Sequence, residues 1–205
     1  MKPLGHKSYG HIPHLPGSRI GEGDHKCSDG QKRICCEKVR DKHDRIIVQE
    51  KSDGSNVSIA KINGVIVALI RAGYLAETSP YEQHHKFSEW VKANTKRFFE
   101  CINNGERLCG EWMLQAHSTR YVLPHEPFIC FDIMRAMERS CYAELHDRLP
   151  FYDIVLPNTI HIGESLSIED AMAKLTVSGH GAIDPVEGAV WRVERNELID
   201  KKKWW

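Results

Sequence analysis

The sequence predicts a single α+β domain in which antiparallel strands form sheets and helices flank them. Two runs typical of β-strands, 46–48 and 57–62, enclose a lysine and a short turn sequence, and the second run leads into Asn63-Gly64 and a third apolar run at 65–70. Asn-Gly between two such runs predicts a two-residue hairpin, whose strands are antiparallel. Aromatic residues at helical spacing follow. A length of 205 residues suits one domain, with two small ones as the alternative.

Residues 1–30 are predicted to form a loop-rich N-terminal arm, because Gly, Pro and His recur too often for a regular helix or a central strand. Zinc binding is disfavoured, because the histidine and cysteine spacings match no known finger and two of the cysteines are adjacent. The candidate ligands are His6, His11, His14, His25, Cys27, Cys35 and Cys36. The charged stretch 33–45 is interpreted as a solvated connector.

Lys51 is predicted to stand at the end of the first strand, with a tight loop behind it formed by the turn-forming residues 53–56. A lysine is ordinarily a charged surface residue. It becomes a nucleophile when burial or neighbouring charges favour its neutral amine. The motif Lys-Ser-Asp-Gly alone is compatible with an ordinary hairpin.

The strand at 65–70 delivers Arg71 to its carboxyl end. A long helix is then predicted to begin at Pro80 and to end before Asn103-Asn104-Gly105. Its apolar residues recur at helical spacing and are interpreted as core. They are Phe87, Trp90, Val91, Phe98 and Cys101.

Two further strands carry candidate site residues. The strand at 107–113 holds Gly110, which permits close backbone approach, and Glu111. In the strand at 128–133, alternation places Ile129 and Phe131 on one face, and Phe128 on the other face is assigned to the core.

The C-terminal part contains one clear helix signal, a capping-box-like sequence that begins at Ser167. Glu187 precedes Gly188 and an apolar run. Lys201 and Lys203 share one face if the end of the chain is extended. A basic C-terminal tail is the alternative interpretation of these lysines.

These motifs, in this order, resemble those of the covalent nucleotidyltransferases, which comprise nucleic-acid ligases and capping enzymes. The motifs are Lys51-Ser52-Asp53-Gly54, Gly110-Glu111, Phe131-Asp132, Glu187-Gly188 and the pair Lys201 and Lys203. The sequence in and around these motifs is most similar to that of the small ATP-dependent RNA ligases. The resemblance implies antiparallel sheets flanked by helices around a nucleotide cleft, as in the ATP-grasp-like domain of ligases. Residues 1–205 would form that one domain, without the further domain that such enzymes often carry.

The resemblance also implies a role for each site residue. Lys51 would attack ATP and form a lysine–AMP intermediate, from which AMP passes to a 5′-phosphate RNA end that a 3′-OH then seals. Asp53 would orient the lysine loop or contact the substrate strand. Mg²⁺ or Mn²⁺ would be held by Glu187. The nucleotide would be bound by Glu50, Lys51, Arg71, Glu111, Phe131, Glu187, Lys201 and Lys203. The segment 14–18, followed by Arg19, resembles the start of some of these ligases and is either a phosphate contact or a plain surface loop.

The alternatives are a DNA ligase, an mRNA guanylyltransferase, or a non-catalytic nucleic-acid-binding remnant of the same fold. Lys and Arg balance Asp and Glu at 28 each, so any basic footprint for nucleic acid must be local. No apolar run is long enough for a membrane span, and the N-terminus is unlike a signal peptide. Seven scattered cysteines predict reduced thiols in a cytoplasmic setting.

Overall fold

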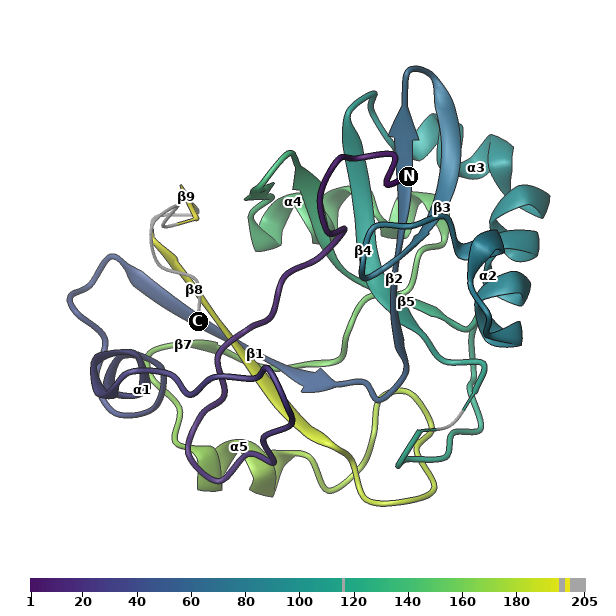
Figure 1. The fold of residues 1–205 in the computed structure, drawn as a ribbon. Coiled ribbons are helices and arrows are strands. Elements are labelled where there is room, and N and C mark those ends of the chain that lie inside the picture. Colours follow the sequence, from purple (N-terminus) through teal and green to yellow (C-terminus); the bar gives the residue numbers. More distant parts are fainter. Residues whose placement is uncertain (116, 196–197, 200–205) are drawn as a thin grey trace.

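Two antiparallel sheets form the framework of the protein (Figure 1). The computed structural model describes residues 1–115, 117–195 and 198–199. One sheet has the strand order β7-β1-β8-β9, and the other has the order β3-β2-β4-β5-β6. The strands are β1 (Asp44–Lys51), β2 (Ser55–Ile62), β3 (Val65–Ile70), β4 (Glu106–Trp112), β5 (Phe128–Arg135), β6 (Glu138–Arg139), β7 (Thr159–Gly163), β8 (Gly188–Arg195) and β9 (Leu198–Ile199).

The chain passes from one sheet to the other at residues 52–54. β1 pairs with β7 and β8, whereas β2 pairs with β3 and β4, so the two strands on either side of the lysine loop belong to different sheets. A Cβ atom on Gly54 would lie 2.7 Å from the backbone oxygen of Trp112. The crossover therefore runs against β4 at a distance that only glycine tolerates.

The predicted hairpin at Asn63-Gly64 is confirmed. Both residues have positive φ, 50° and 77°, and they join β2 to β3. This is the backbone that a two-residue hairpin turn requires. The predicted strands at 107–113 and 128–133 are also present as β4 and β5, which pair with each other.

Helices cover the outer side of each sheet (Figure 1). The aromatic stripe predicted for one long helix belongs to two, α2 and α3, separated at Asn94. The Asn94 and Thr95 side chains donate to the backbone oxygens of Trp90 and Lys92, at 2.9 Å and 2.8 Å. Such local bonds compete with the helical pattern, which explains the break. The helices are α1 (Asp29–Cys36), α2 (Glu82–Ala93), α3 (Thr95–Cys101), α4 (Tyr142–Arg148) and α5 (Ile168–Lys174), with short 3₁₀ turns at Ala76–Thr78 and Pro150–Tyr152.

Helix α1 lies where the sequence predicts the end of the arm and a connector. It begins with a capping box in which the Ser28 hydroxyl and the Gln31 side chain each bond to the other residue's backbone. The predicted helix at Ser167 is confirmed as α5, and the Ser167 hydroxyl accepts from the Asp170 N–H at 3.0 Å. Neither α4 nor β7 is predicted from the mixed stretch 138–166.

Each sheet has its own hydrophobic core. The five-stranded sheet packs against α2, α3 and α4 around Phe87, Phe98 and Phe128, all of which are buried. The four-stranded sheet packs against α1 and α5 around Ile46, Val48 and other residues. The assignment of Phe128 to the core is therefore confirmed. A third, smaller cluster joins Tyr9 of the N-terminal segment to Cys109 of β4 and Met134 of β5.

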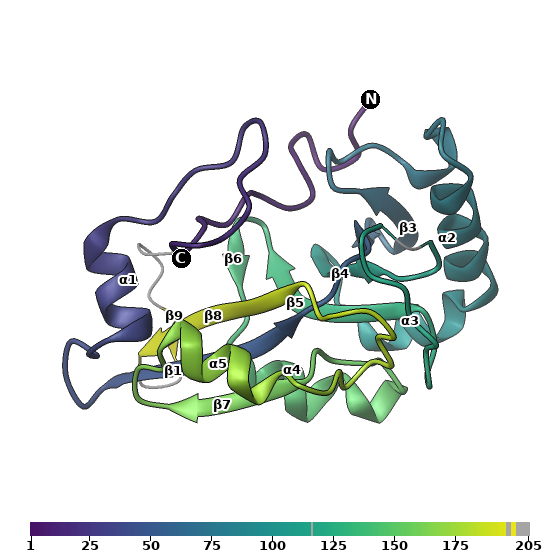
Figure 2. The ribbon, with the colours of Figure 1, turned by 90° about the horizontal axis from the view of Figure 1, so that it is seen from below.

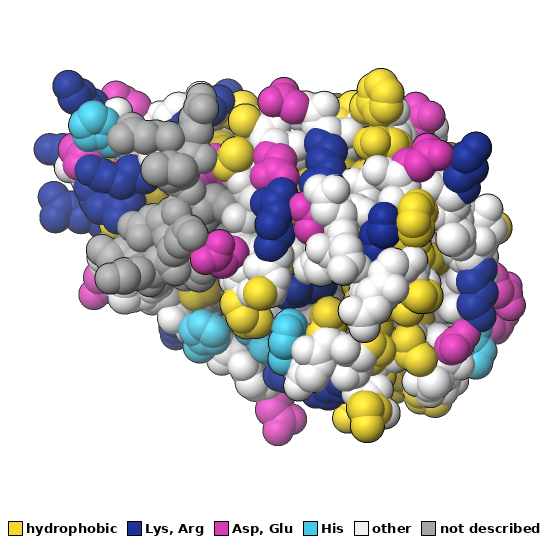
Figure 3. All heavy atoms as spheres, turned by 90° about the horizontal axis from the view of Figure 1, so that it is seen from above, with side chains coloured by type: hydrophobic (Ala, Val, Ile, Leu, Met, Phe, Trp, Pro, Cys, Tyr) yellow, Lys and Arg dark blue, Asp and Glu magenta, His cyan; other side chains and the backbone are white. Residues whose placement is uncertain are grey.

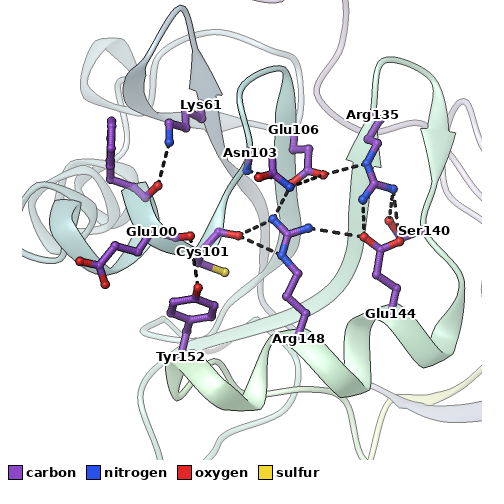
Figure 4. Close-up of polar contacts among 11 residues, drawn as sticks. Lys61, Glu100, Cys101, Asn103, Glu106, Arg135, Ser140, Glu144, Arg148 and Tyr152 are labelled. Atoms are coloured by element: carbon purple, nitrogen blue, oxygen red, sulfur yellow. Dashed lines mark hydrogen bonds and ion pairs between the residues drawn. The ribbon is translucent and has the colours of Figure 1, made fainter.

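An ion network around the buried Glu106 ties α4 to the start of β4 (Figure 4). The Glu106 carboxylate accepts from Arg148 of α4 at 2.5 Å, from Arg135 of β5 at 2.7 Å and from the Asn103 backbone at 3.0 Å. Arg135 also reaches Glu144 of α4. Burial alone would raise the pKa of Glu106, but the hydrogen bonds from Arg148 and Asn103 outweigh it and hold the pKa at about 2.

Replacing Glu106 by glutamine is expected to lower the free energy of unfolding by about 3 kcal/mol at neutral pH, because two arginines lose a shared buried partner. Glu106 has a folded pKa below its ordinary value of 4.5. Its stabilisation is therefore complete above pH 4.5 and is lost as the pH falls toward 2. Urea unfolding of the wild type and of Glu106→Gln should show that their difference in the free energy of unfolding shrinks as the pH falls. Glu89→Gln, on the exposed face of α2, is the control. An equal difference at every pH would contradict the linkage.

The surface carries no dominant charge in the view of Figure 3. Basic and acidic side chains lie interspersed across this face, apart from a basic group at its left edge. Among the described residues, none of the helices is long and apolar enough to cross a membrane. All seven cysteines are unpaired.

Candidate active site

A cavity of about 1000 Å³ lies between the two sheets. Its walls include the end of β1 and the middle of β8 from one sheet, and residues of β2 to β6 from the other. Residues of the N-terminal arm, defined here as residues 1–28, complete the lining. Figures 1 and 2 both show this arm running from the β3 side of the molecule to α1, so that it spans both sheets.

Lys51 ends β1 and lines this cavity. Its cross-strand partner is Gly188, the first residue of β8, so the residue before it, Glu187, comes beside the lysine. The Lys51 Nζ donates to the Glu187 Oε1 in an ion pair whose side chains remain about one-third exposed. Two motifs 136 residues apart are thus brought together by one pair of antiparallel strands.

Asp53 anchors the crossover to a loop after β4. Its carboxylate accepts from the Ser118 N–H and hydroxyl, each at 2.6 Å, and from the Thr119 N–H at 2.8 Å, while its own N–H donates to the Tyr121 hydroxyl. Burial works against ionisation of Asp53, but the bonds from Ser118 and Thr119 outweigh it and lower the pKa. These bonds hold the crossover against the loop after β4; whether Asp53 orients the lysine loop or contacts the substrate strand stays a prediction.

Glu111 of β4 lines the same cavity and stands opposite Asn56 of β2. The Asn56 side chain donates to it at 3.3 Å. Burial raises the pKa of Glu111 to about 8, against the hydrogen bond from Asn56 and the positive charge of Lys51. A carboxyl with a raised pKa can donate a hydrogen bond to a ligand when it is protonated and accept one when it is ionised.

Arg71 follows β3 and also lines the cavity. Its Nη2 donates to the Gly10 oxygen of the arm at 3.0 Å. Several cavity residues, Arg71 among them, have a buried polar atom without a hydrogen-bond partner among the described residues. These atoms are Ser52 Oγ, Asn56 Oδ1, Arg71 Nε and Gln83 Oε1. Buried polar groups are normally paired, so this cluster indicates a polar ligand.

Phe131 and Ile129 both line the cavity, as their predicted common face requires. The Phe131 ring meets the Tyr9 ring of the arm edge-on, with centroids 5.0 Å apart. Tyr9 is held there because its hydroxyl donates to Asp132 at 2.5 Å. Asp132 also binds Arg192 of β8 at 2.7 Å, which joins the two sheets beside the cavity.

Glu50 lies next to Lys51, and its carboxylate is occupied by protein groups. It accepts from the Asn158 side chain at 3.1 Å, from the Gly179 N–H at 2.8 Å and from the Ser178 hydroxyl. These bonds fix the end of β1 to the segments around residues 158 and 178. A nucleotide that bound Glu50 would therefore have to compete with these hydrogen bonds.

The two remaining predicted site residues, Lys201 and Lys203, lie outside the described residues. Conversely, Ser118, Thr119 and Tyr121, which hold Asp53, are not predicted from the sequence. They belong to a loop without periodic patterning, and no local signal marks them. Within the part of the chain that the structure describes, no three His, Cys, Asp or Glu side chains gather as a metal-binding group.

Comparison with solved structures shows a common fold. An archaeal ATP-dependent RNA ligase matches with a TM-score of 0.53 and 21% identity, over 73% of this chain and 39% of that one. The Naegleria gruberi RNA ligase, as a mutant with AMP and Mn, matches with a TM-score of 0.60 and 17% identity, over 94% and 59%. A putative ATP-dependent DNA ligase from Aquifex aeolicus matches with a TM-score of 0.55 and 16% identity, over 84% and 44%.

The present chain thus spans 39 to 59% of the length of these three proteins. No curated protein sequence matches it. The model of the RNA ligase family matches residues 44–204, a range that holds both sheets and all of the predicted motifs from Lys51 to Lys203. Because this range is well over half of its length, the chain belongs to the RNA ligase family.

Proposed function

We propose that this protein is an ATP-dependent RNA ligase that works through a lysine–AMP intermediate on Lys51. The Lys51 Nζ forms a bond to the α-phosphorus of ATP, and the bond from that phosphorus to the pyrophosphate oxygen breaks. AMP then passes to the 5′-phosphate of an RNA end, and a 3′-OH displaces it to seal the strand. Phosphoryl-group transfers of this kind depend mainly on positioning and electrostatics.

One observation carries the proposal: Lys51 and Glu187 form an ion pair in a cavity whose walls hold several unpartnered polar atoms. An ammonium group paired with a carboxylate has no lone pair for attack. Glu187 must therefore release Nζ, and the lysine must lose a proton, before the bond to phosphorus can form. The neighbouring Arg71 Nε is a donor of the kind that binds phosphate or ribose oxygens.

The donor set fits Mg²⁺ or Mn²⁺ shared with a nucleotide. Mg²⁺ is commonly bound by one or two carboxylates together with substrate phosphates and water, rather than by a complete protein cage. Glu187, on the cavity wall beside Lys51, supplies one such carboxylate. A cation held there would offset the negative charge of the triphosphate.

The other nucleotide contacts are proposed from their position on the cavity wall and from the motifs. Arg71 and Glu111 would bind phosphate and ribose, and Phe131 would stack on the base. Asp53 would keep the lysine loop in place. Glu50 would act indirectly, by fixing the end of β1 that carries Lys51. Lys201 and Lys203, which lie outside the described residues, remain predicted phosphate contacts. RNA as the substrate is proposed from the family and from the RNA ligases that share the fold.

The test is to incubate the chain with ATP and Mg²⁺ and to measure its intact mass. We expect a gain of one AMP, and transfer of that AMP when 5′-phosphorylated RNA is added. A parallel incubation with GTP distinguishes a guanylyltransferase, and nicked DNA distinguishes a DNA ligase. A chain that gains no mass from either nucleotide would favour the non-catalytic alternative.

A further inference from the structure

The carboxylate of Glu50 is buried next to Lys51 in the chain and accepts hydrogen bonds from three neutral groups. These are the Asn158 side-chain amide, the Gly179 N–H and the Ser178 hydroxyl. The backbone takes part as well, because the Glu50 N–H donates to the Asn158 oxygen at 2.8 Å. The end of β1 is therefore held by two segments that lie far from it in the sequence.

His180 joins these two segments to each other. Its ring is buried, and the ring Nε2 accepts from the Asn158 backbone N–H at 3.1 Å. Its own backbone N–H donates to the Ser178 hydroxyl at 3.0 Å. One residue thus fixes both Asn158 and Ser178, which in turn bind Glu50. Loss of the ring would leave the Asn158 N–H without this acceptor.

A second histidine holds the His180 ring. The His180 Nδ1 lies 2.9 Å from the His125 Nε2, and the His125 Nδ1 lies 2.7 Å from the Glu126 backbone oxygen. A carbonyl oxygen can only accept and a backbone N–H can only donate, so both ends of this chain assign the ring protons. The His125 Nδ1–H donates to Glu126, the His180 Nδ1–H donates to His125, and the His180 Nε2 accepts from Asn158.

This chain of hydrogen bonds is complete when both rings are neutral. A further proton on the His180 Nε2 would face the Asn158 N–H, and two donors cannot bond to each other. Burial lowers the pKa of His180 to about 4, against the negative charge of Glu50. The His180 ring is therefore a neutral, directional connector between His125 and Asn158.

His125 belongs to the same loop that binds Asp53 on the other side of Lys51. Residues 120–122 of this loop pair with residues 181–183 through backbone hydrogen bonds of 2.8 and 3.0 Å. The loop is thus fastened to the chain beside His180 before the two rings meet. Through these contacts it holds the residues that precede and follow Lys51.

The position of the lysine matters because its amine must approach the α-phosphorus in line with the departing pyrophosphate. A misplacement of about 1 Å in a reacting group can lower a rate by about a hundredfold. Glu50 is joined to Lys51 by a peptide bond, so the groups that fix Glu50 also fix the origin of the Lys51 side chain.

We propose that His180, held by His125, is a positioning residue for formation of the lysine–AMP bond: it locks the two segments that bind Glu50 and so fixes Lys51 at the end of β1. This inference rests on the proposed function. Neither histidine is among the residues that line the cavity. The pair should therefore affect the rate of attack on ATP and leave the binding of ATP unchanged.

The test compares His180→Ala with His161→Ala, a histidine of β7 whose ring bonds to the Glu164 backbone oxygen and does not line the cavity. In single-turnover assays at saturating ATP, His180→Ala is expected to slow AMP-adduct formation by about ten- to a hundredfold. The ATP concentration for half-maximal rate should not change. His180→Gln, whose amide oxygen can accept from the Asn158 N–H, should recover part of the rate, and His161→Ala should match the wild type.

A double variant separates positioning from a general loss of structure, with each protein assayed below its melting temperature. If His180 acts through Glu50, His180→Ala combined with Glu50→Ala should be about as slow as Glu50→Ala alone, because effects that share one path are not additive. Losses that multiply would overturn the proposal. An unchanged rate in His180→Ala, or a change confined to the ATP concentration for half-maximal rate, would also overturn it.

Amide hydrogen exchange tests the positioning without the reaction. In His180→Ala, the Glu50 N–H should exchange at least about tenfold faster than in the wild type, because the acceptor on Asn158 is no longer held in place. The Ile47 N–H, in the middle of β1, should exchange as before. Equal exchange of the Glu50 N–H in the two proteins would overturn the proposal. If the wild type forms no adduct, the proposed function fails, and the exchange measurement still decides whether His180 fixes the end of β1.

Discussion

Replacing Lys51 by alanine is expected to abolish the AMP adduct, a loss of more than about a thousandfold, because it removes the atom that bonds to phosphorus. Lys51→Arg should lose the adduct as well. Arginine keeps the positive charge beside Glu187, but its guanidinium is never deprotonated in proteins and so cannot attack. Intact mass after incubation with ATP and Mg²⁺ measures both variants.

The fold should survive these substitutions. Both side chains of the Lys51–Glu187 pair remain partly exposed, and such pairs contribute about 1 kcal/mol or less to stability. Thermal unfolding checks this directly. Lys42→Ala, in the exposed connector before β1, is the matched control and should form the adduct at the wild-type rate. An adduct that persists on Lys51→Ala, or that peptide mapping places on another lysine, would contradict the assignment.

The local pattern of the sequence predicts single elements of this fold well. Asn63-Gly64 encodes its own turn geometry, and Ser167 supplies its own helix cap, so each prediction depends on neighbouring residues only. Alternation in β5 likewise separates Phe128 in the core from Phe131 at the cavity. The Ser28–Gln31 capping box marks α1 in the same local way, although the connector interpretation overlooks it.

Features that depend on residues far apart in the sequence cannot be predicted from local sequence patterns. Nothing near Lys51 indicates that β1 and β2 join different sheets, because strand pairing is decided by residues more than 100 positions away in β7 and β8. The same holds for the contacts of Asp53 with Ser118 and Thr119. The candidate site was predictable mainly through the resemblance, which supplies the order of motifs that the topology brings together.

At Glu187, the contribution of side-chain charge to the rate of adduct formation can be separated from the contribution of side-chain size. Glu187→Gln keeps the size of the side chain but loses its charge, and a neutral amide is a poor substitute for a carboxylate at a divalent cation. We expect adduct formation to fall by at least about a hundredfold, since an anchored cation contributes several kcal/mol of charge stabilisation. Glu187→Ala should be no more active. Glu164→Gln, an exposed position after β7, is the control.

The dependence of the rate on Mg²⁺ distinguishes the two partners of this carboxylate. If Glu187 holds the cation, Glu187→Gln should require a higher Mg²⁺ concentration for half-maximal rate, and high Mg²⁺ should restore part of the activity. If its main effect is on Lys51, the rate should change while the Mg²⁺ requirement does not. A glutamine variant with near wild-type activity at every Mg²⁺ concentration would exclude a need for charge. Glu187 would then only position the lysine through the hydrogen bond seen between them.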